Sequence, residues 1–401
     1  MAREPIMDRN QRVYAYELLF RSSHRNVYEA VDGDRSTLDV ITNSLLILGL
    51  EELAGRRPAF INFTRNLLVR EVPELLAPGL VTVEILEDVE PDEEVLAACR
   101  RLKAAGYVLA LDDFVFSASG TPLLDFADIV KVDFSGTTLE ERVRIARDLR
   151  RRGIKALAEK VETREEFEQG VAAGYSFFQG YFFSTPVILS GRRIPDQKLS
   201  LLRLLPEIHQ PDLRFDEIEA IIKHDLSLTY KLLRLVNSAH FSLRENISSI
   251  KHALVLLGAK EVRNWCSLLA MQALGDNKPA ELILQSNTRG CMAESLASLV
   301  GWERQAPQLF LMGIFSLIDA ILDMPMAEIL SPLPVGEPVK RALLGHPCPF
   351  KTLLDLIVAY QRGDWTLFST HVRSLDLDEP AASRALAEAL RRSLWIPRRQ
   401  T

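Results

Sequence analysis

Residues 93–114, EEVLAACRRLKAAGYVLALDDF, contain the unit that decides the fold. The first part has the spacing of an amphipathic helix, and Gly106 is placed to cap its C-terminus. A short apolar run begins at Tyr107 and ends in two acids, Asp112 and Asp113. A helix followed by a buried strand is the repeating unit of a parallel α/β architecture.

The same alternation extends over the first half of the chain. We expect the preceding EPIMDR and DRNQ to form the first arm of a hairpin. Strands are predicted in RVYAYELLF, PAFINF, VTVEIL, YVLALDDF, DIVKVDF, IKALAEKV and YSFFQGYFF, with helical spacers between them. Eight strands, one of them antiparallel to the rest, can close into a TIM-like (β/α)8 barrel.

After Pro186 the alternation stops, and from about Leu201 nearly everything has helical period. In SSIKHALVLLG, for example, Ser249 is the expected N-cap and Gly258 the stop. We therefore predict an α/β domain followed by an all-α domain. The expected ranges are a barrel over 1–190, a linker over 191–199, a helical domain over 200–390 and a basic tail over 391–401.

Composition excludes several classes of protein. With 401 residues, 25% of them charged and 47% hydrophobic, two globular domains can each bury a core. The net charge of -6 argues against broad binding to nucleic acid, and the closing RRSLWIPRRQ is most simply a solvated basic tail. Four separated cysteines have no zinc spacing, the N-terminus has no apolar signal core, and no apolar stretch is long enough to span a bilayer. A cytoplasmic, soluble protein without membrane contact is expected.

Acidic and amide side chains recur where the predicted strands end. They are Glu17, Asn62, Glu84, Asp112, Asp113 and Glu159. An α/β barrel gathers these strand ends around one mouth, and oxygen ligands of this kind suit Mg²⁺ or Mn²⁺. An adjacent Asp-Asp pair can serve two metals, which together can clamp the attacking and leaving oxygens of a phosphodiester.

Lys131, in VKVD, is expected to face the same mouth, where it could steady the attacking water or the developing charge. Simpler alternatives exist for single residues. Lys131 could snorkel to solvent, and Glu84 or Glu87 alone could cap the next helix.

These motifs, in this order, resemble those of the EAL domain, a barrel family that linearises the bacterial messenger cyclic di-GMP. The family's Glu-Ala-Leu appears as Glu17-Leu18-Leu19, and its late glutamine as Gln179 in FFQGYFFSTP. The resemblance covers about residues 1–190. Further matches are Asn62 in FINFT, Glu84 and Glu87 in VEILED, Asp112-Asp113-Phe114, Lys131 in VKVD, and Glu159 and Glu162 in AEKVET.

The resemblance implies a site in which two Mg²⁺ or Mn²⁺ ions act on cyclic di-GMP and release linear pGpG. It implies that Glu17, Lys131 and Glu159 are catalytic, with Glu159 at the metal-associated or general-base position. The implied metal ligands are Glu17, Asn62, Glu84, Asp112, Asp113 and Glu159. Substrate contacts are implied for Arg21, Gln179 and Leu19, with Glu87 and Glu162 supporting the ligands from behind.

Two departures from the family pattern keep a second hypothesis open. DDFVFSASG replaces the usual Asp-Asp-Phe-Gly-Thr-Gly, so Val115 stands where glycine gives backbone freedom, and Lys160 replaces the glycine after Glu159. The sequence favours an active phosphodiesterase. A catalytically inactive cyclic di-GMP receptor, or a scaffold for a protein partner, is the alternative.

The second half, roughly 197–390, resembles the HDOD domain, a helical relative of HD-type phosphohydrolases. The resemblance rests on DLSLTYKLLRLVNSAHF, ISSIKHALVLLG and LFLMGIFSLID. Ser316 and Leu317 stand where an HD-type enzyme carries its metal-binding His and Asp, so metal chemistry is not expected there. His224-Asp225 spells HD but is read as a helix cap, and Asn237 as a structural element of a helix end. The domain is expected to bind a protein partner or to regulate the barrel, and a homodimer is compatible with the resemblance.

Overall fold

The computed structural model describes residues 2–19, 50, 54–55, 57–112, 122–186, 194–210, 215–223, 230, 232–234, 236–237, 247 and 249–394. The chain divides into two compact units. One comprises residues 1–185 and 359–367, and the other comprises residues 186–358 and 368–401.

A closed barrel of eight strands forms the first unit, and strands adjacent in sequence are adjacent in the sheet. β1 pairs antiparallel with β2 and β8, whereas the other pairs are parallel. The predicted TIM-like barrel with one antiparallel strand is confirmed. The strands are β1 (Ala2–Asp8), β2 (Val13–Leu19), β3 (Ala59–Phe63), β4 (Val81–Ile85), β5 (Val108–Leu111), β6 (Ile129–Asp133), β7 (Lys155–Glu159) and β8 (Phe177–Gln179).

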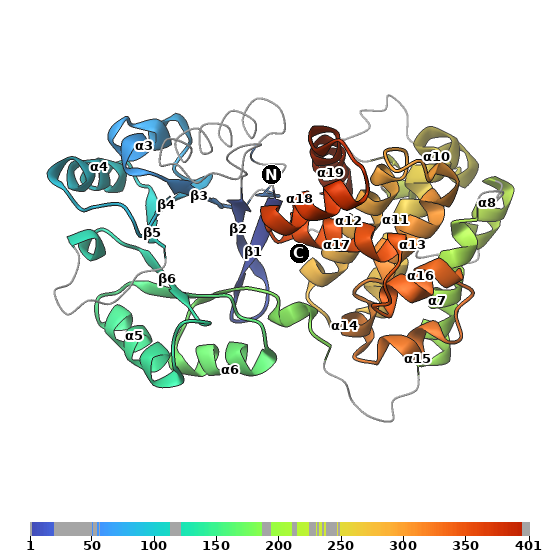
Figure 1. Ribbon diagram of the computed structural model, residues 1–401, viewed down its shortest axis with the longest axis horizontal. Helices are drawn as coiled ribbons and strands as arrows, with labels where there is room; N and C mark the ends of the chain where they lie inside the picture. The colour runs from blue at the N-terminus through green and yellow to red at the C-terminus, as the bar shows by residue number, and fades with distance from the viewer. Residues whose placement is uncertain are drawn as a thin grey trace. The chain divides into compact units, whose positions relative to one another are not determined.

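Helices lie around the outside of these strands (Figure 1). Those of the described barrel residues are α3 (Arg65–Val69), η2 (Val72–Leu75), α4 (Glu93–Ala104), η3 (Pro122–Asp125), α5 (Leu139–Arg151), α6 (Arg164–Ala173) and η4 (Phe182–Ser184). α5 and α6 each begin with a capping box, built by Thr138 and Thr163. Gly106, at φ 87°, follows α4 as predicted.

Apolar side chains fill the barrel. Seven strands contribute one residue each to a buried cluster of Ile6, Ala15, Phe60, Ala110, Ile129, Leu157 and Phe177. β8 is shorter than predicted, because the chain turns at Gly180 with φ 134° and continues into η4. The interior of the barrel is therefore a packed core, and it supports the side chains at the carboxyl ends of the strands.

From residue 194 on, the described residues form helices and connecting turns without a strand. α10 begins after Ser249, which accepts a hydrogen bond from the His252 backbone N–H, and it ends at Gly258, as predicted. The helices are α7 (Asp196–Ile208), α8 (Phe215–Lys223), α10 (Ile250–Leu257), α11 (Ala259–Leu274), α12 (Ala280–Leu296), η6 (Glu303–Gln305), α13 (Ala306–Phe315), α14 (Ile318–Leu322), α15 (Met326–Leu330), α16 (Glu337–Leu343), α17 (Pro349–Gln361), α18 (Trp365–Ser374) and α19 (Glu379–Leu394).

α12 is the central helix, and it packs closely against α13 and α19. A Cβ at Gly313 would lie 2.4 Å from the Arg289 backbone oxygen, so only glycine lets α13 approach α12 this closely. Asn237 clamps a helix end, since its side chain bonds to the backbones of Leu233 and Ile247. This confirms the structural interpretation of Asn237.

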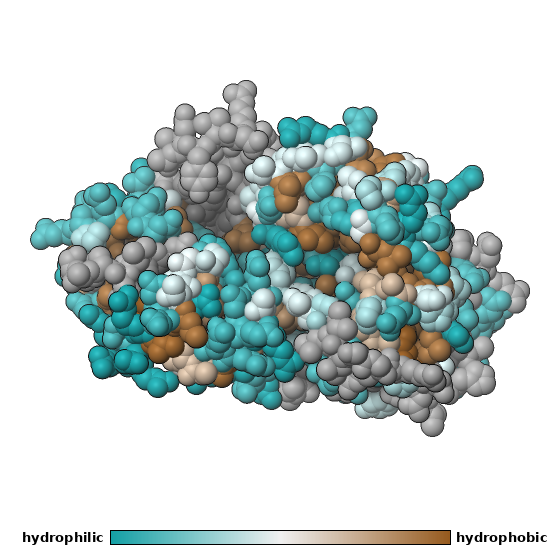
Figure 2. Space-filling view, turned by 60° about the horizontal axis from the view of Figure 1, so that its bottom comes forward, coloured by the Kyte–Doolittle hydropathy of each residue, from teal (hydrophilic) through white to brown (hydrophobic). Residues whose placement is uncertain are grey.

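Hydrophilic residues dominate the face in Figure 2, with hydrophobic residues showing between them. Among the described residues, no helix is both long and apolar enough to cross a membrane. α7 begins at Asp196, inside the range proposed as a linker, and α19 ends at Leu394, inside the proposed tail. The domain ranges themselves stay a proposal.

The stability of the helical unit should fall in mild acid because of His209. Burial, with the charge of Arg263, lowers the pKa of this histidine to about 3. It stacks on Phe310 and shares a 2.8 Å hydrogen bond with Ser267. Below about pH 6.5 this histidine binds a proton in the unfolded chain, whereas in the folded chain it stays neutral until about pH 3. The free energy of unfolding therefore decreases as pH falls from about 6.5 toward 3. At pH 5 the loss should be about 2 kcal/mol.

Calorimetric unfolding at pH 7.5 and pH 5 measures this effect. His209→Gln should remove most of the difference between the two pH values. His346→Gln, at an exposed histidine, serves as the control and should leave it unchanged. A His209→Gln protein with the full acid sensitivity of the parent would contradict the assignment.

Candidate active site

A polar layer lies directly above the apolar core of the barrel. Side chains two residues apart on a strand face the same side, so every residue of the core cluster except Ile6 of β1 is followed two positions later by a polar residue that also faces inward. The pairs are Ala15 and Glu17, Phe60 and Asn62, Ala110 and Asp112, Ile129 and Lys131, Leu157 and Glu159, and Phe177 and Gln179. On β4, Glu84 follows the buried Thr82 in the same way. The polar layer therefore occupies the carboxyl ends of the parallel strands.

Lys131 is the centre of this layer. Its Nζ lies 2.8 Å from Glu159 Oε1, 3.0 Å from Asp112 Oδ1 and 3.4 Å from Glu17 Oε2. It also donates a hydrogen bond to Oε1 of Glu84. With only 1% of Lys131 exposed, the alternative of a lysine that snorkels to solvent is wrong.

Glu17 joins the other side of the layer. Gln179 Nε2 donates to Glu17 Oε2 at 2.7 Å, and Asn62 Nδ2 donates to Glu17 Oε1 at 3.3 Å. Gln179 Nε2 also donates to Glu4 Oε2 at 3.0 Å. Glu4 was not among the predicted site residues. Its signal is the pairing of β1 with β2, which sets Glu4 directly opposite Glu17.

The layer holds more negative than positive charge. Burial raises the pKa of Glu84 well above its ordinary value, and the charge of Glu17 adds to this effect. Burial likewise raises the pKa of Glu159 to about 8, although Lys131 opposes the shift. Burial lowers the pKa of Lys131, but the surrounding carboxylates outweigh it and keep the ammonium protonated. Four carboxyl groups thus surround a single buried cation.

This donor set fits divalent cations. Oε2 of Glu84 and Oε1 of Gln179 are buried and have no hydrogen-bond partner among the described residues. Oxygen atoms of this kind, in a site with excess negative charge, are suitable ligands for a hard cation. As they stand, the described carboxylates converge on the Lys131 ammonium, and no three described His, Cys, Asp or Glu residues form a ready-made metal cluster.

The remaining predicted site residues lie away from this layer or outside the described residues. Glu87 and Glu162 are exposed, and Leu19, at the end of β2, is partly buried. Arg21 and Asp113 lie outside the described residues, as do Val115 and His224-Asp225.

Lys160 follows Glu159 at φ 53°, a left-handed conformation that few lysines adopt. Its ammonium forms an ion pair with Asp133, the residue that pairs with Glu159 across β6 and β7. The extra cation expected from the sequence is therefore at the rim of the site, bound to an acid of the neighbouring strand.

The helical unit offers no metal ligands at the positions expected in an HD-type enzyme. Ser316 Oγ donates to the Gly313 carbonyl and accepts a 3.2 Å hydrogen bond from Arg289 Nη1, and Leu317 is buried.

Comparisons with known proteins find a matching family for each half of the chain. The model of the EAL domain matches residues 44–186, and the model of the HDOD domain matches residues 194–325. The chain is 38% identical to the uncharacterized protein YuxH of Bacillus subtilis, with 94% of each covered. It is 36% identical to the cyclic di-GMP phosphodiesterase CdgJ of Vibrio cholerae, with 99% of this chain and 93% of that protein covered.

Among solved structures, BlrP1 of Klebsiella pneumoniae in a manganese and cyclic di-GMP complex is 27% identical, with a TM-score of 0.39. The match covers 45% of this chain and 54% of that one, so the chain spans about half of BlrP1. The full-length similarity to YuxH and CdgJ, with both domain models in the same order, shows the family. The chain belongs to the family of proteins in which an EAL domain is followed by an HDOD domain.

Proposed function

We propose that the barrel is a cyclic di-GMP phosphodiesterase that uses divalent cations, with two Mg²⁺ or Mn²⁺ ions expected, and that releases linear pGpG. The observation that carries the proposal is the polar layer, in which four carboxylates from four strands surround the buried Lys131. The near full-length similarity to CdgJ, a cyclic di-GMP phosphodiesterase, supports the same reaction.

Carboxylate and amide oxygens of the layer would hold the cations, which would activate water and stabilise the charge on the phosphate. The residues in question are Glu17, Asn62, Glu84, Asp112 and Glu159, together with Asp113 from the sequence. Lys131 keeps its proton and places a fixed positive charge beside them. Gln179 holds Glu17 in place. The charge of bound cations would lower the raised pKa of Glu159, and its carboxylate would then accept the proton of the attacking water.

A second function is favoured by Lys160. This lysine has φ 53° and forms an ion pair with Asp133, and it alters the rim of the site next to Glu159. Strained residues cluster where binding or switching matters. A receptor that binds cyclic di-GMP without hydrolysis, and passes the signal to a protein partner of the HDOD unit, accounts for this change as well.

Incubation of the purified full chain with cyclic di-GMP and Mn²⁺ tests the proposal. The parent protein should form pGpG, measured by chromatography, and Glu17→Ala should form it at least about 100-fold more slowly. Glu17 accepts hydrogen bonds from Asn62 and Gln179 and forms an ion pair with Lys131. Its loss should therefore disorganise the whole site. Glu165→Ala, at an exposed position of α6, is the matched control and should keep the parental rate.

If the parent protein forms no more pGpG than Glu17→Ala, the enzymatic claim fails. Calorimetry with Ca²⁺ and cyclic di-GMP then separates the two functions. Tight binding of the nucleotide without turnover would support the receptor.

A further inference from the structure

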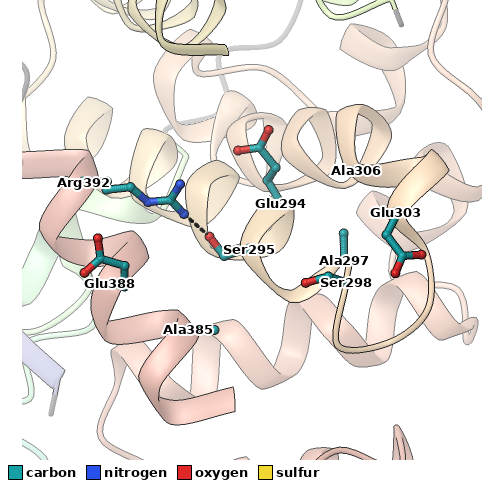
Figure 3. A pocket seen from close by; sticks show the side chains of 9 residues that line it. All are labelled: Glu294, Ser295, Ala297, Ser298, Glu303, Ala306, Ala385, Glu388 and Arg392. Atoms are coloured by element: carbon teal, nitrogen blue, oxygen red, sulfur yellow. Dashed lines mark hydrogen bonds between the residues drawn. The ribbon is translucent and has the colours of Figure 1, made fainter. Parts of the chain in front are cut away.

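The helical unit has a surface hollow of about 520 Å³ between α12 and α19 (Figure 3). Arg392 of its lining donates a hydrogen bond to Ser295 Oγ and so joins the two helices, and Glu388 pairs with Arg391 at 2.8 Å. These contacts explain both charged side chains without a ligand. An acid that the fold alone does not explain lies instead in the barrel, at Glu4.

Glu4 is a largely buried acid beside another acid. It lies on β1 directly opposite Glu17 of β2, and it is not among the four acids that surround Lys131. Burial, together with the charge of Glu17, raises its pKa to about 7, so keeping this carboxyl charged costs free energy. Its carboxyl accepts a 3.0 Å hydrogen bond from Gln179 Nε2. The contact with Gln179 therefore indicates what Glu4 contributes.

The amide of Gln179 lies between two carboxyl groups. Its nitrogen carries two hydrogens, one donated to Glu17 Oε2 at 2.7 Å and the other to Glu4 Oε2 at 3.0 Å. Carboxylates only accept hydrogen bonds, so both contacts require the nitrogen of the amide on this side. If the amide turned over, Oε1 would face two carboxylate oxygens and both hydrogen bonds would be lost. The two acids thus fix which way the amide faces.

Oε1 of Gln179 is the atom that this orientation leaves for another partner. It is buried and has no hydrogen-bond partner among the described residues. An amide oxygen is an ordinary ligand for a hard divalent cation. Without Glu4, one N–H of the amide would be buried and unpaired, and a single hydrogen bond to Glu17 would hold the orientation. Glu4 therefore doubles the number of hydrogen bonds that keep Oε1 on the side away from the acids.

We propose that Glu4 is a positioning residue of the active site, which acts through Gln179 and keeps its amide oxygen available to a divalent cation. The inference rests on the proposed phosphodiesterase function and adds a residue to it. Glu4 reaches the site because β1 runs antiparallel, so the beginning of this strand lies beside the end of β2. Its contact is with Gln179, and its role is to fix the orientation of that neighbour.

Mn²⁺ binding to the full chain, measured by calorimetry at pH 8 without nucleotide, tests this role separately from hydrolysis. Glu4→Met and Glu4→Leu remove the acceptor, and each should weaken Mn²⁺ binding about ten-fold, as is usual for residues that orient a ligand. Glu4→Gln keeps an acceptor oxygen at the same reach, so its affinity should stay within about three-fold of the parent. Glu165→Met, at an exposed position of α6, is the control and should bind as the parent does.

A Gln179→Met background separates positioning from a merely structural role. Because Glu4 acts through Gln179, adding Glu4→Met to this background should change Mn²⁺ affinity less than about two-fold. The rate of pGpG formation at saturating Mn²⁺ should follow the same pattern. If the parent binds Mn²⁺ but forms no pGpG, the phosphodiesterase function fails, whereas the affinities still decide the role of Glu4.

Thermal unfolding shows whether each variant is folded, and the two apolar variants differ in shape, so a loss common to both is not due to misfit. A full ten-fold loss from Glu4→Met in the Gln179→Met background would overturn the proposal. Glu4→Gln binding as weakly as Glu4→Met would also overturn it, as would parental affinity in both apolar variants or a parent that binds no Mn²⁺. Recovery by glutamine, with no further loss once Gln179 is replaced, would establish it.

Discussion

Replacing Lys131 with methionine should lower the free energy of unfolding of the metal-free barrel by about 3–5 kcal/mol at pH 8. Methionine has similar length and no charge, so the four carboxylates around Nζ lose their shared cation without a large change in packing. Glu84 and Glu159 are buried beside it and cannot turn to solvent as they stand. Chemical unfolding in EDTA, monitored by the hydrogen exchange of the barrel strands, measures this loss of free energy.

The loss should be smaller at pH 5 than at pH 8. The pKa of Glu159 is about 8 in the folded protein, and the pKa of Glu84 is also raised. A carboxyl whose pKa is raised by folding stabilises the protein fully below its unfolded pKa of about 4.5, and that contribution disappears as pH rises through the folded pKa. Removing Lys131 should raise these pKa values further, so the variant should recover stability as the carboxyls take up protons.

Mn²⁺ should stabilise Lys131→Met more than it stabilises the parent, because the cation meets four carboxylates and no ammonium. Hydrolysis should nevertheless fall at least about 100-fold in the variant, since its fixed positive charge is gone. Lys103→Met is the matched control. Lys103 pairs with Asp128 at a partly exposed position, so its loss should cost less than about 1 kcal/mol and show no special response to Mn²⁺. Equal losses in the two variants would contradict the central role of Lys131.

The sequence predicted the parallel strands and their polar ends because both follow a local rule. Along six strands the site residue comes two positions after a residue of the core cluster, as with Ile129 and Lys131, and this spacing can be read from the sequence alone. This rule did not identify Glu4, and the reason is physical. β1 runs antiparallel, so its beginning rather than its end reaches the mouth of the barrel, and a search of strand ends misses it.

Contacts between strands are the part that local patterns do not determine. The sequence indicated that Lys131 and five acids would face one mouth, but not that four of these acids would converge on a single ammonium. The same is true of Gln179, whose amide binds Glu17 and Glu4 from two other strands. The early turn at Gly180 was missed too, because the apolar run continues through Phe182 and Phe183 and looks like strand.

Gly180→Ala should separate the ends of β7 and β8 and destabilise the barrel by about 3 kcal/mol or more. Gly180 has φ 134°, which an alanine rarely adopts. A Cβ there would lie 2.3 Å from the Val161 backbone oxygen and 2.5 Å from its nitrogen. Both contacts are with backbone atoms, and the Val161 backbone is held by hydrogen bonds to Gln179 and Phe182. Neither backbone segment can therefore move aside without a large cost in free energy.

Gly180→Ala should lower catalytic activity as well as stability. Gln179 immediately precedes Gly180, and Val161 is two residues from Glu159, so forcing these segments apart moves both side chains relative to Glu17. We expect pGpG formation to fall at least about ten-fold, because small displacements of positioning residues are costly in catalysis. Hydrogen exchange of β7 and β8 in the full chain should rise at the same time, while exchange in α12 and α13 stays as in the parent.

Gly136→Ala distinguishes this steric cause from a general sensitivity to added methyl groups. Gly136 is also in a barrel loop, but nothing lies within 4 Å of a Cβ placed there, and its φ is not in the left-handed region. The control should therefore keep the parental exchange rates and activity. If Gly180→Ala behaved like Gly136→Ala, the backbone contact between Gly180 and Val161 would not be what holds Gln179 against Glu17. If exchange rose while activity stayed at the parental level, Gln179 would have no positioning role in the reaction.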